Sequence, residues 1–249
     1  MKPKTKAAVA GLGEVGKPLF DILSGCYDVI GFDVEPPARV EPVDVLHICY
    51  PFQIPDFLGE GARYIEMFQP TLTVINSTVS VGTTRALAGK TGAVVVNSPV
   101  RGKHVRMLEE LRVYKKFIGA MEPEDGARAA HHFEAAGMQT SVLSSPEATE
   151  LAKLTETTYF GLMIAWAQEV ERYCDQSGQK YDEVVSFYEE IRFFPPVKYF
   201  PGVIGGHCVL PNIETLRKWT ASDLLDAIWN SNRMKAEREE SRKAVEAVA

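Results

Sequence analysis

A glycine pattern near the N-terminus constrains the fold of this 249-residue chain more than any other feature. Gly11-x-Gly13-x-x-Gly16 follows the apolar run Ala7–Ala10 and opens a helical pattern that continues through Leu23. Gly11 permits a tight turn, Gly13 lets a ligand approach the backbone, and Gly16 allows close packing of the helix on the strand. This context predicts a doubly wound α/β domain of the Rossmann type that binds a dinucleotide over the turn.

Short apolar runs recur through the first part of the chain. Runs of this kind, separated by helical or loop stretches, are typical of a parallel sheet covered by helices on both faces. After the first strand, the expected strands are 28–33, 44–50, 71–76, 93–97, 116–120 and 139–143.

The pattern changes near residue 145, where we place a domain boundary. Ser145 before Pro146 is typical of a helix start, with serine as the cap and proline at the first helical position. Apolar residues then recur at helical spacing to Cys174, and Gly178 is the expected end of a long helix. We therefore predict an NAD-binding α/β domain over residues 1–145 and a helical substrate and dimerisation domain over residues 146–249.

Within the second domain we expect one further helix, a loop and a final helix. The helix is expected over 181–191, the loop over 192–210, and the final helix begins after a cap at Ser222. The end of that last helix, 235–242, is so rich in charged residues that we expect it to be solvated or frayed.

Composition limits the partners that the chain can have. It holds 27 basic and 33 acidic residues, which gives a net charge of −6, and an acidic surface disfavours non-specific binding to nucleic acid. No apolar run approaches the ~20 residues of a membrane span, and the basic N-terminus leads straight into the glycine turn, so no signal peptide is predicted. The cysteines form no CxxC pair, so neither a metal site nor disulfides are expected. We predict a cytoplasmic protein with a small-molecule substrate.

The choice of cofactor depends on Asp33, which ends the second expected strand 20 residues beyond Gly13. A carboxylate at this place accepts both ribose hydroxyls and repels a 2′-phosphate. The N-terminus of the first helix favours the pyrophosphate through its unpaired N–H groups and its dipole. We therefore predict NAD rather than NADP. The alternatives are a glycine turn without a ligand and a solvated Asp33.

Four segments resemble the UDP-glucose/GDP-mannose dehydrogenase family, and they occur in the family's order. Gly11–Pro18 is similar to its opening GxGxVGxP, and Asn76–Arg85 to its STVPVGTT segment. Glu150–Tyr159 is similar to its E-x-x-K-x-x-x-N-x-Y helix, and Phe200–Pro211 to the glycine-rich loop that bears its catalytic cysteine. The resemblance covers residues 7 to about 235 and implies an NAD-dependent oxidoreductase that acts on CH–OH groups.

The sequence also departs from the family pattern. The family's Asn one turn after its catalytic Lys is Thr157 here, and the Lys and Asp after its Cys-x-x correspond to Pro211 and Asn212. Segment 97–102 resembles instead the D-A-P-V-S-G substrate loop of the β-hydroxyacid dehydrogenases. Family members carry a third, nucleotide-sugar domain, so the resemblance implies a truncated form that acts on a small polar or anionic alcohol or aldehyde.

The predicted chemistry depends on Lys153 and Cys208. Oxidation of a carbinol needs a base near the hydroxyl, and the resemblance implies that Lys153 serves as acid and base, whereas helical spacing alone indicates a surface lysine. Thr157, one turn further on, is expected to position the ammonium or a water. The resemblance implies that Cys208 traps an aldehyde as a thiohemiacetal, and the alternative is a buried, unreactive thiol.

The remaining predicted site residues lie on loops that follow the expected strands. The resemblance implies that Thr78 lies beside the nicotinamide, and a basic cluster after the fifth strand could hold a carboxylate or phosphate, or be a solvated loop. The predicted cofactor-binding residues are Gly11, Leu12, Gly13, Glu14, Val15, Gly16, Asp33, Tyr50, Pro51, Ser77 and Thr78. The predicted substrate-binding residues are Ser98, Val100, Arg101, Gly102, Lys103 and His207.

Three functions remain open on the sequence. The first is an NAD-dependent dehydrogenase of the nucleotide-sugar type, and the second a β-hydroxyacid-type dehydrogenase or carbonyl reductase without cysteine chemistry. The third is a non-catalytic NAD-binding protein. A change in NADH absorbance that depends on Cys208 favours the first, one that does not depend on it favours the second, and binding without turnover favours the third.

Two further expectations concern surfaces. The long helix carries apolar and aromatic residues beyond one stripe, including Phe160 and Trp166, which predicts a symmetric homodimer. His131 and His132 have no partner at metal-ligand spacing and are expected at the surface.

Overall fold

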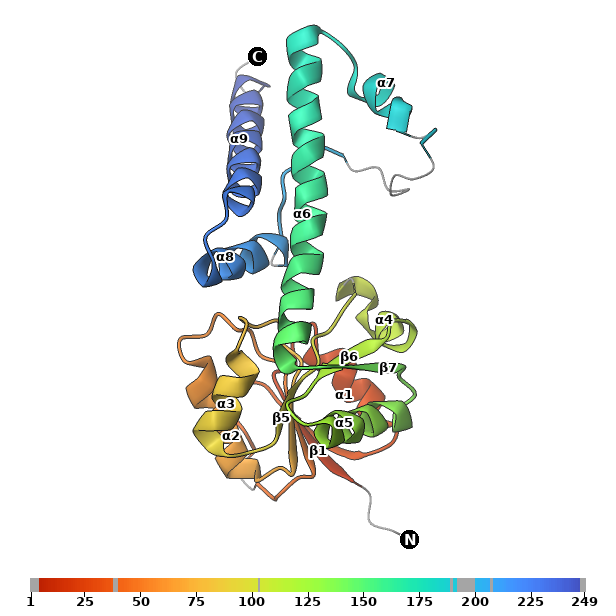
Figure 1. The fold of residues 1–249 in the computed structure, drawn as a ribbon, viewed down its shortest axis with the longest axis vertical. Helices are drawn as coiled ribbons and strands as arrows, with labels where there is room; N and C mark the ends of the chain where they lie inside the picture. Colours follow the sequence, from red (N-terminus) through yellow and green to blue (C-terminus); the bar gives the residue numbers. More distant parts are fainter. Residues whose placement is uncertain are drawn as a thin grey trace. The chain divides into compact units, whose positions relative to one another are not determined.

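The computed structural model describes residues 5–37, 40–102, 104–188, 190–191, 200–206 and 208–246. The chain divides into two compact units, Met1–Lys153 and Leu154–Ala249. The division lies inside a long helix that begins at Pro146, next to the boundary predicted at residue 145. Both units are drawn in Figure 1.

A seven-stranded sheet with the order β2-β1-β3-β4-β5-β6-β7 forms the centre of the first unit (Figure 1). The predicted doubly wound α/β fold is confirmed. Neighbouring strands are parallel except β5 and β6, which are antiparallel. An apolar strand pattern does not encode direction, so the sequence did not reveal this reversal. The strands are β1 (Lys6–Ala10), β2 (Asp28–Phe32), β3 (Val45–Ile48), β4 (Leu72–Ile75), β5 (Val95–Asn97), β6 (Lys116–Gly119) and β7 (Thr140–Leu143).

Helices cover both faces of the sheet (Figure 1). One face packs against α1 (Gly16–Ser24), α4 (Met107–Val113) and α5 (Pro123–Ala135). The other packs against α2 (Phe57–Phe68) and α3 (Thr83–Thr91). Alternate residues of β1 point into the two apolar layers, so this strand is buried on both sides. Because β1 to β5 are parallel, their carboxyl ends meet at one edge of the sheet, where such sheets bind ligands.

The long helix α6 (Pro146–Ser177) begins and ends as predicted. The Ser145 hydroxyl oxygen accepts a hydrogen bond from the N–H of Ala148 at 3.2 Å, and Pro146 occupies the first helical position. Gly178 follows the last residue with a φ of +69°, which a glycine adopts without strain. Local sequence signals are therefore sufficient to define both ends of this helix.

The second unit is helical, and α6 packs closely on the helix that follows the glycine-rich loop. A Cβ atom at Gly161 of α6 would lie 2.8 Å from Cγ1 of Val209 and 3.2 Å from Cδ1 of Ile213, so glycine permits this approach. Both contacts belong to α8, a helix that the sequence patterns did not predict. The other elements are α7 (Tyr181–Val185), a 3₁₀ turn (Ser186–Tyr188), α8 (Val209–Trp219) and α9 (Asp223–Glu246).

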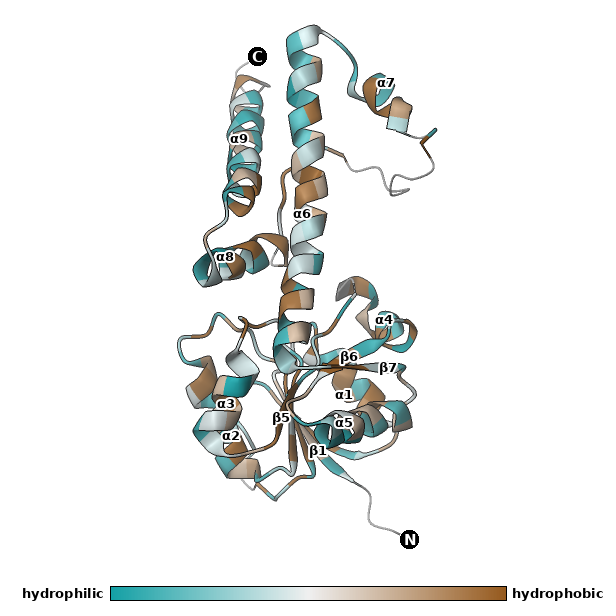
Figure 2. Ribbon diagram, in the orientation of Figure 1, coloured by the Kyte–Doolittle hydropathy of each residue, from teal (hydrophilic) through white to brown (hydrophobic). Residues whose placement is uncertain are grey.

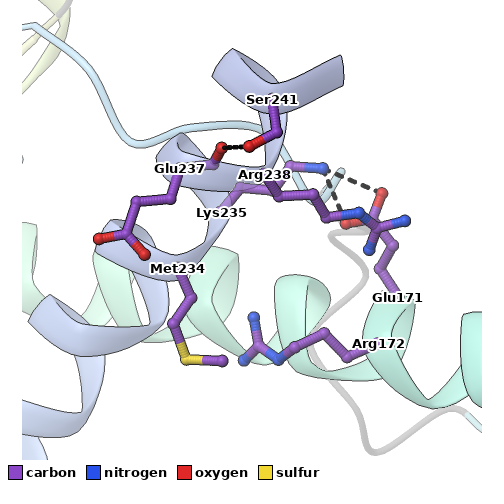
Figure 3. Close-up of a pocket in the computed structure, with 7 residues that line it drawn as sticks. All are labelled: Glu171, Arg172, Met234, Lys235, Glu237, Arg238 and Ser241. Carbon is purple, nitrogen blue, oxygen red and sulfur yellow. Dashed lines mark hydrogen bonds and ion pairs between the residues drawn. The ribbon is translucent and has the colours of Figure 1, made fainter. Parts of the chain in front are cut away.

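The expectation that 235–242 is solvated is wrong at Lys235. This side chain is 7% exposed, and its Nζ atom lies 3.0 and 2.7 Å from the two carboxylate oxygens of Glu171 on α6 (Figure 3). The same Nζ atom lies 3.0 Å from a carboxylate oxygen of Glu239. The partner on α6 comes from a distant part of the sequence, so composition alone could not identify it. The pocket beside this ion pair contains none of the predicted site residues; it is lined by Glu171, Arg172, Met234, Lys235, Glu237, Arg238 and Ser241.

Polar and apolar residues alternate along α6 and α9 (Figure 2). Within the described part of the chain, no helix combines the length and the hydrophobicity needed to cross a lipid bilayer.

Candidate active site

The glycine turn after β1 has the geometry that a dinucleotide requires. Gly11 has a φ of +92°, and a Cβ atom there would lie 2.7 Å from the backbone nitrogen of Tyr50. A Cβ atom at Gly16 would overlap the carbonyl oxygen of Gly11, so the close packing of α1 needs a glycine. Gly13 is exposed, with open space where its Cβ would be, so a ligand can reach this backbone.

The predicted ribose carboxylate lies beside this turn. Asp33 directly follows β2, is exposed, and has one oxygen 3.3 Å from the backbone nitrogen of Leu12. Leu12 and Val15 are half-buried and Glu14 is exposed. The turn and the acid therefore occupy neighbouring strand ends, and the donor set fits the phosphates and ribose of NAD.

The other predicted cofactor residues follow β3, which is next to β1 in the sheet, and β4, which is next to β3. The Ser77 hydroxyl donates a hydrogen bond to the Tyr50 carbonyl oxygen at 2.6 Å, so the two loops are held together. Tyr50 is buried, and its hydroxyl contacts the Phe57 carbonyl oxygen at 3.3 Å. Pro51 is exposed and Thr78 is half-buried. These loops extend the same edge of the sheet as the glycine turn.

We expect NAD to bind more tightly than NADP, because the Asp33 carboxylate repels a 2′-phosphate. Asp33→Ala should raise the affinity for NADP relative to that for NAD, so the two affinities should become more similar. Titration calorimetry with each cofactor measures the ratio, and Glu35→Ala, which removes an exposed acid nearby, is the matched control. A wild-type preference for NADP would contradict the assignment.

The loop 97–102 lies beside β6 and presents one cationic side chain. Ser98 is fully buried, and its hydroxyl donates a hydrogen bond to the Phe117 carbonyl oxygen at 2.9 Å. Val100 is also buried. Arg101 is half-buried, with its guanidinium 5.4 Å from the Phe117 ring centroid and 5.7 Å from that of Tyr114. Ser98 and Val100 therefore anchor the loop, while Arg101 is the candidate contact for an anionic substrate.

The structure describes one of the three remaining residues that are predicted to bind substrate. Gly102 has a φ of +136°, and a Cβ atom there would lie 2.5 Å from Oε2 of Glu110, so this position accepts glycine alone without strain. Lys103 lies outside the described residues, as does His207.

A buried carboxylate fixes the start of α6 against the segment that contains Thr78. Glu150 is 1% exposed and accepts hydrogen bonds from the backbone N–H groups of Gly82 and Thr84 at 2.7 and 2.8 Å, and from the Thr84 hydroxyl at 2.6 Å. Burial raises the pKa of Glu150, although these hydrogen bonds oppose the shift. Lys153 is half-buried one turn later. Glu150 therefore sets the position of Lys153 relative to the 76–85 segment, a role that sequence reasoning missed.

The glycine-rich loop of the second unit is held by two buried amide side chains. Gln168 of α6 donates a hydrogen bond to the Gly202 carbonyl oxygen at 2.8 Å. The Asn232 side chain bonds both the N–H and the carbonyl oxygen of Ile204, at 2.7 and 3.2 Å. Cys208 is half-buried and lies at the N-cap of α8. These hydrogen bonds hold the loop at Gly202 and Ile204, a few residues before the candidate nucleophile.

Two departures from the family pattern contact each other in this unit. The Asn212 side-chain amide donates a hydrogen bond to the Thr157 hydroxyl at 2.9 Å. Asn212 also lies one turn after Cys208, since its backbone N–H bonds the Cys208 carbonyl oxygen at 3.3 Å. The pair joins α6 to the start of α8. No sequence signal identified it, because 55 residues separate the partners.

The first unit thus carries the glycine turn, Asp33, Thr78 and the 97–102 loop at the carboxyl ends of its parallel strands, and it also contains Lys153. The second unit holds Thr157 and Cys208. The convergence of Lys153 and Cys208 stays a prediction, because they belong to different units.

The expectation that His132 lies at the surface is wrong. Its ring is 5% exposed and stacks on Tyr27, and its Nε2 atom lies 3.0 Å from Nε2 of the fully buried His47 on β3. The other ring nitrogen of His47 contacts the Asn76 amide at 3.2 Å. A partner on β3 cannot be read from the sequence around α5, whereas His131 is exposed as expected. Among the described residues, no group of side chains could hold a metal ion.

Comparison with known proteins identifies the relatives of this chain. Residues 147–233 match the central domain of the UDP-glucose/GDP-mannose dehydrogenase family. A UDP-N-acetyl-D-mannosamine dehydrogenase from Methanocaldococcus jannaschii is 26% identical over 209 residues, 78% of this chain and 48% of that protein. An NDP-N-acetyl-D-galactosaminuronic acid dehydrogenase from Ralstonia nicotianae is 26% identical over 68% of this chain and 46% of that protein. The chain spans about half the length of these relatives.

Solved structures agree with the fold. The UDP-D-ManNAc dehydrogenase of Pyrococcus horikoshii superposes with a TM-score of 0.83 at 20% identity, covering 98% of this chain and 72% of that one. The 3-hydroxyisobutyrate dehydrogenase of Mycobacterium tuberculosis superposes with a TM-score of 0.70 at 16% identity, covering 94% and 93%. The resemblance to the UDP-glucose/GDP-mannose dehydrogenase family is confirmed. The names of these relatives agree with the predicted oxidoreductase activity.

Proposed function

We propose that this chain is an NAD-dependent dehydrogenase that oxidises a CH–OH group of a nucleotide-linked sugar. The observation that carries the proposal is the glycine turn with Asp33 beside it, in the same unit as Lys153. The substrate class is supported by the nucleotide-sugar dehydrogenases that the chain resembles. Arg101 is the proposed contact for an anionic group of the substrate, because a guanidinium binds carboxylate or phosphate through two parallel hydrogen bonds.

In the proposed reaction, Lys153 as a neutral amine takes the proton of the carbinol hydroxyl and becomes an ammonium. Bound NAD supplies the acceptor for the hydride that leaves the carbinol carbon. Thr157, one turn further along α6, orients the amine or a water. The Cys208 thiol would add to the resulting aldehyde as a thiohemiacetal and would hold this carbon for a second oxidation to a thioester, for which NAD would again supply the hydride acceptor; water would then hydrolyse the thioester and return the free thiol.

The experiment that tests the cysteine step counts NADH formed per substrate consumed. Wild-type protein should form about two NADH per substrate molecule if the thioester route operates. Cys208→Ala should stop after the first oxidation and form about one. Cys174→Ala, which changes a buried cysteine in the same unit, is the matched control. A wild-type yield of one NADH that Cys208→Ala does not change would contradict cysteine chemistry.

That contrary result would favour a second candidate, a β-hydroxyacid-type dehydrogenase that performs one oxidation. Two replacements favour this candidate: the family's Asn and Asp are Thr157 and Asn212 in this chain. These two side chains form a hydrogen bond with each other. The 97–102 loop sequence favours it as well. NAD binding without turnover on either substrate class would indicate the non-catalytic function.

We also propose that the protein is a homodimer formed through α6. Tyr159, Trp166 and Tyr173 are each about half exposed, and they recur every seven residues along one side of this helix. A second copy would remove these rings from water. Light scattering at micromolar concentration should give twice the mass of the chain for the wild type. For Trp166→Glu it should give the mass of a single chain. A monomeric wild-type protein would contradict the proposal.

A further inference from the structure

Two buried amide side chains of the second unit have no role in the proposed mechanism, although both bind the glycine-rich loop. Gln168 of α6 is fully buried, and Asn232 of α9 is 7% exposed. The Asn232 amide pairs with Ile204 as a neighbouring β-strand would. Its Oδ1 atom accepts from the Ile204 N–H at 2.7 Å, and its Nδ2 atom donates to the Ile204 carbonyl oxygen at 3.2 Å. One side chain therefore satisfies both backbone groups of a buried residue, in a described segment, 200–206, that has neither helix nor strand.

A chain of hydrogen bonds fixes the direction in which these amides point. Arg172 of α6 donates to the Ser231 hydroxyl oxygen at 3.0 Å, and this hydroxyl donates to Oε1 of Gln168 at 2.9 Å. Nε2 of Gln168 then donates to the Gly202 carbonyl oxygen at 2.8 Å. A guanidinium can only donate and a carbonyl oxygen can only accept, so the order of donors and acceptors along the chain is determined. The loop is therefore held by side chains whose orientation is fixed.

Cys208 lies between this attachment and a second one. The exposed pair Gly205-Gly206 follows Ile204, with open space where a Cβ atom would be. α8 begins directly after Cys208, and its first residue, Val209, is buried and lies against Gly161 of α6. Glycines leave the backbone many conformations, so the path of the chain toward Cys208 depends on where Ile204 is held.

We propose that Asn232 is a positioning residue of the candidate active site, which holds the glycine-rich loop at Ile204 and so sets the place from which the Cys208 thiol attacks the aldehyde carbon. The inference rests on the proposed function of Cys208 as the nucleophile. A nucleophile must be held close to the carbon that it attacks, and a displacement of about 1 Å can lower a rate by about 100-fold. Loss of this anchor should therefore slow the cysteine step and spare the first oxidation, which does not use the thiol.

Two measurements on Asn232→Ala test the inference. The yield of NADH should fall from about two to about one per substrate consumed, while the rate of the first oxidation stays within about twofold of the wild type. Alkylation of Cys208 by iodoacetamide, followed by mass spectrometry of its peptide, should become about tenfold faster, because two hydrogen bonds that oppose local opening of the loop are lost. Asn230→Ala, which changes an exposed asparagine of the same helix, should alter neither value.

The two measurements separate positioning from a general loss of stability. A variant that is only less stable should lose both oxidations in proportion and keep the wild-type number of NADH molecules per substrate. That result, or an alkylation rate of Cys208 equal to that of the wild type, overturns the inference. A wild-type yield of one NADH that Cys208→Ala does not change contradicts the proposed cysteine step instead, and the alkylation rate still decides whether Asn232 holds the loop.

The wild-type protein alone keeps the inference testable if Asn232→Ala does not fold. Hydrogen exchange of the Ile204 amide, corrected for intrinsic rates, should be at least about tenfold slower than that of the exposed Gly205, because the Ile204 N–H is bound to Asn232. Equal corrected rates would show that the amide does not hold the loop, and they overturn the inference without bearing on the proposed function.

Discussion

Lys153→Met should lower kcat for NAD-dependent oxidation by about 10²–10⁴-fold while leaving the affinity for NAD nearly unchanged. The variant removes the group that takes the hydroxyl proton, which matters in the transition state and not in cofactor binding. The glycine turn, Asp33 and the loops after β3 and β4 remain as they are. Stopped-flow absorbance of NADH gives the rate, and calorimetry gives the dissociation constant for NAD.

The control for this variant is Lys90→Met, which removes an exposed lysine from the end of α3 in the same unit. It should keep full activity. Two results would contradict the role of Lys153. One is a kcat within about threefold of the wild type, far short of the loss expected for a general base. The other is a large loss of NAD affinity, which would indicate that the lysine binds the cofactor instead.

The buried histidine pair should make the folded state sensitive to acid. Burial, with a smaller contribution from His131, lowers the pKa of His132 to about 4, and burial also lowers that of His47. An unfolded histidine has a pKa of about 6.5, so the unfolded chain binds protons that the native state rejects. This contribution to stability is fully present above about pH 6.5 and is lost as the pH falls toward 4. His132 alone should account for a loss of about 3 kcal/mol.

Urea unfolding between about pH 7 and pH 4.5 measures this effect, within the range in which the histidine titrates in the unfolded chain. His132→Phe keeps a ring against Tyr27 and removes one of the two titrating groups, so its free energy of unfolding should fall less steeply with acid than that of the wild type. His131→Gln changes the exposed neighbour and should keep most of the wild-type slope. Equal slopes for His132→Phe and the wild type would contradict the assignment.

Features encoded within a few neighbouring residues could be predicted from the sequence. The glycine turn, the strand ends that carry Asp33 and Ser77, and the two ends of α6 all depend on local residue preferences, and the structure places them as expected. Strand direction is not local. The reversal of β6 depends on how the 97–102 loop pairs with the chain about 20 residues later, and no periodic pattern records that choice.

The polar contacts that organise the candidate site were not predictable for a related reason. Glu150 stands in a recognisable motif, but its partners at Gly82 and Thr84 lie 68 and 66 residues earlier. Lys116 looked like part of an ordinary apolar strand, and its burial became visible only with the Ser98 carbonyl oxygen beside it. Contacts between distant segments have no signature in one sequence.

The formation of NADH from NAD and a UDP-N-acetylhexosamine by the purified chain is the measurement that tests the central claim most directly. The proposed function predicts saturable NADH formation by the wild type and its loss in Lys153→Met, with NAD bound equally by both proteins. A wild-type protein that binds NAD and forms no NADH from nucleotide-linked sugars would contradict the claim.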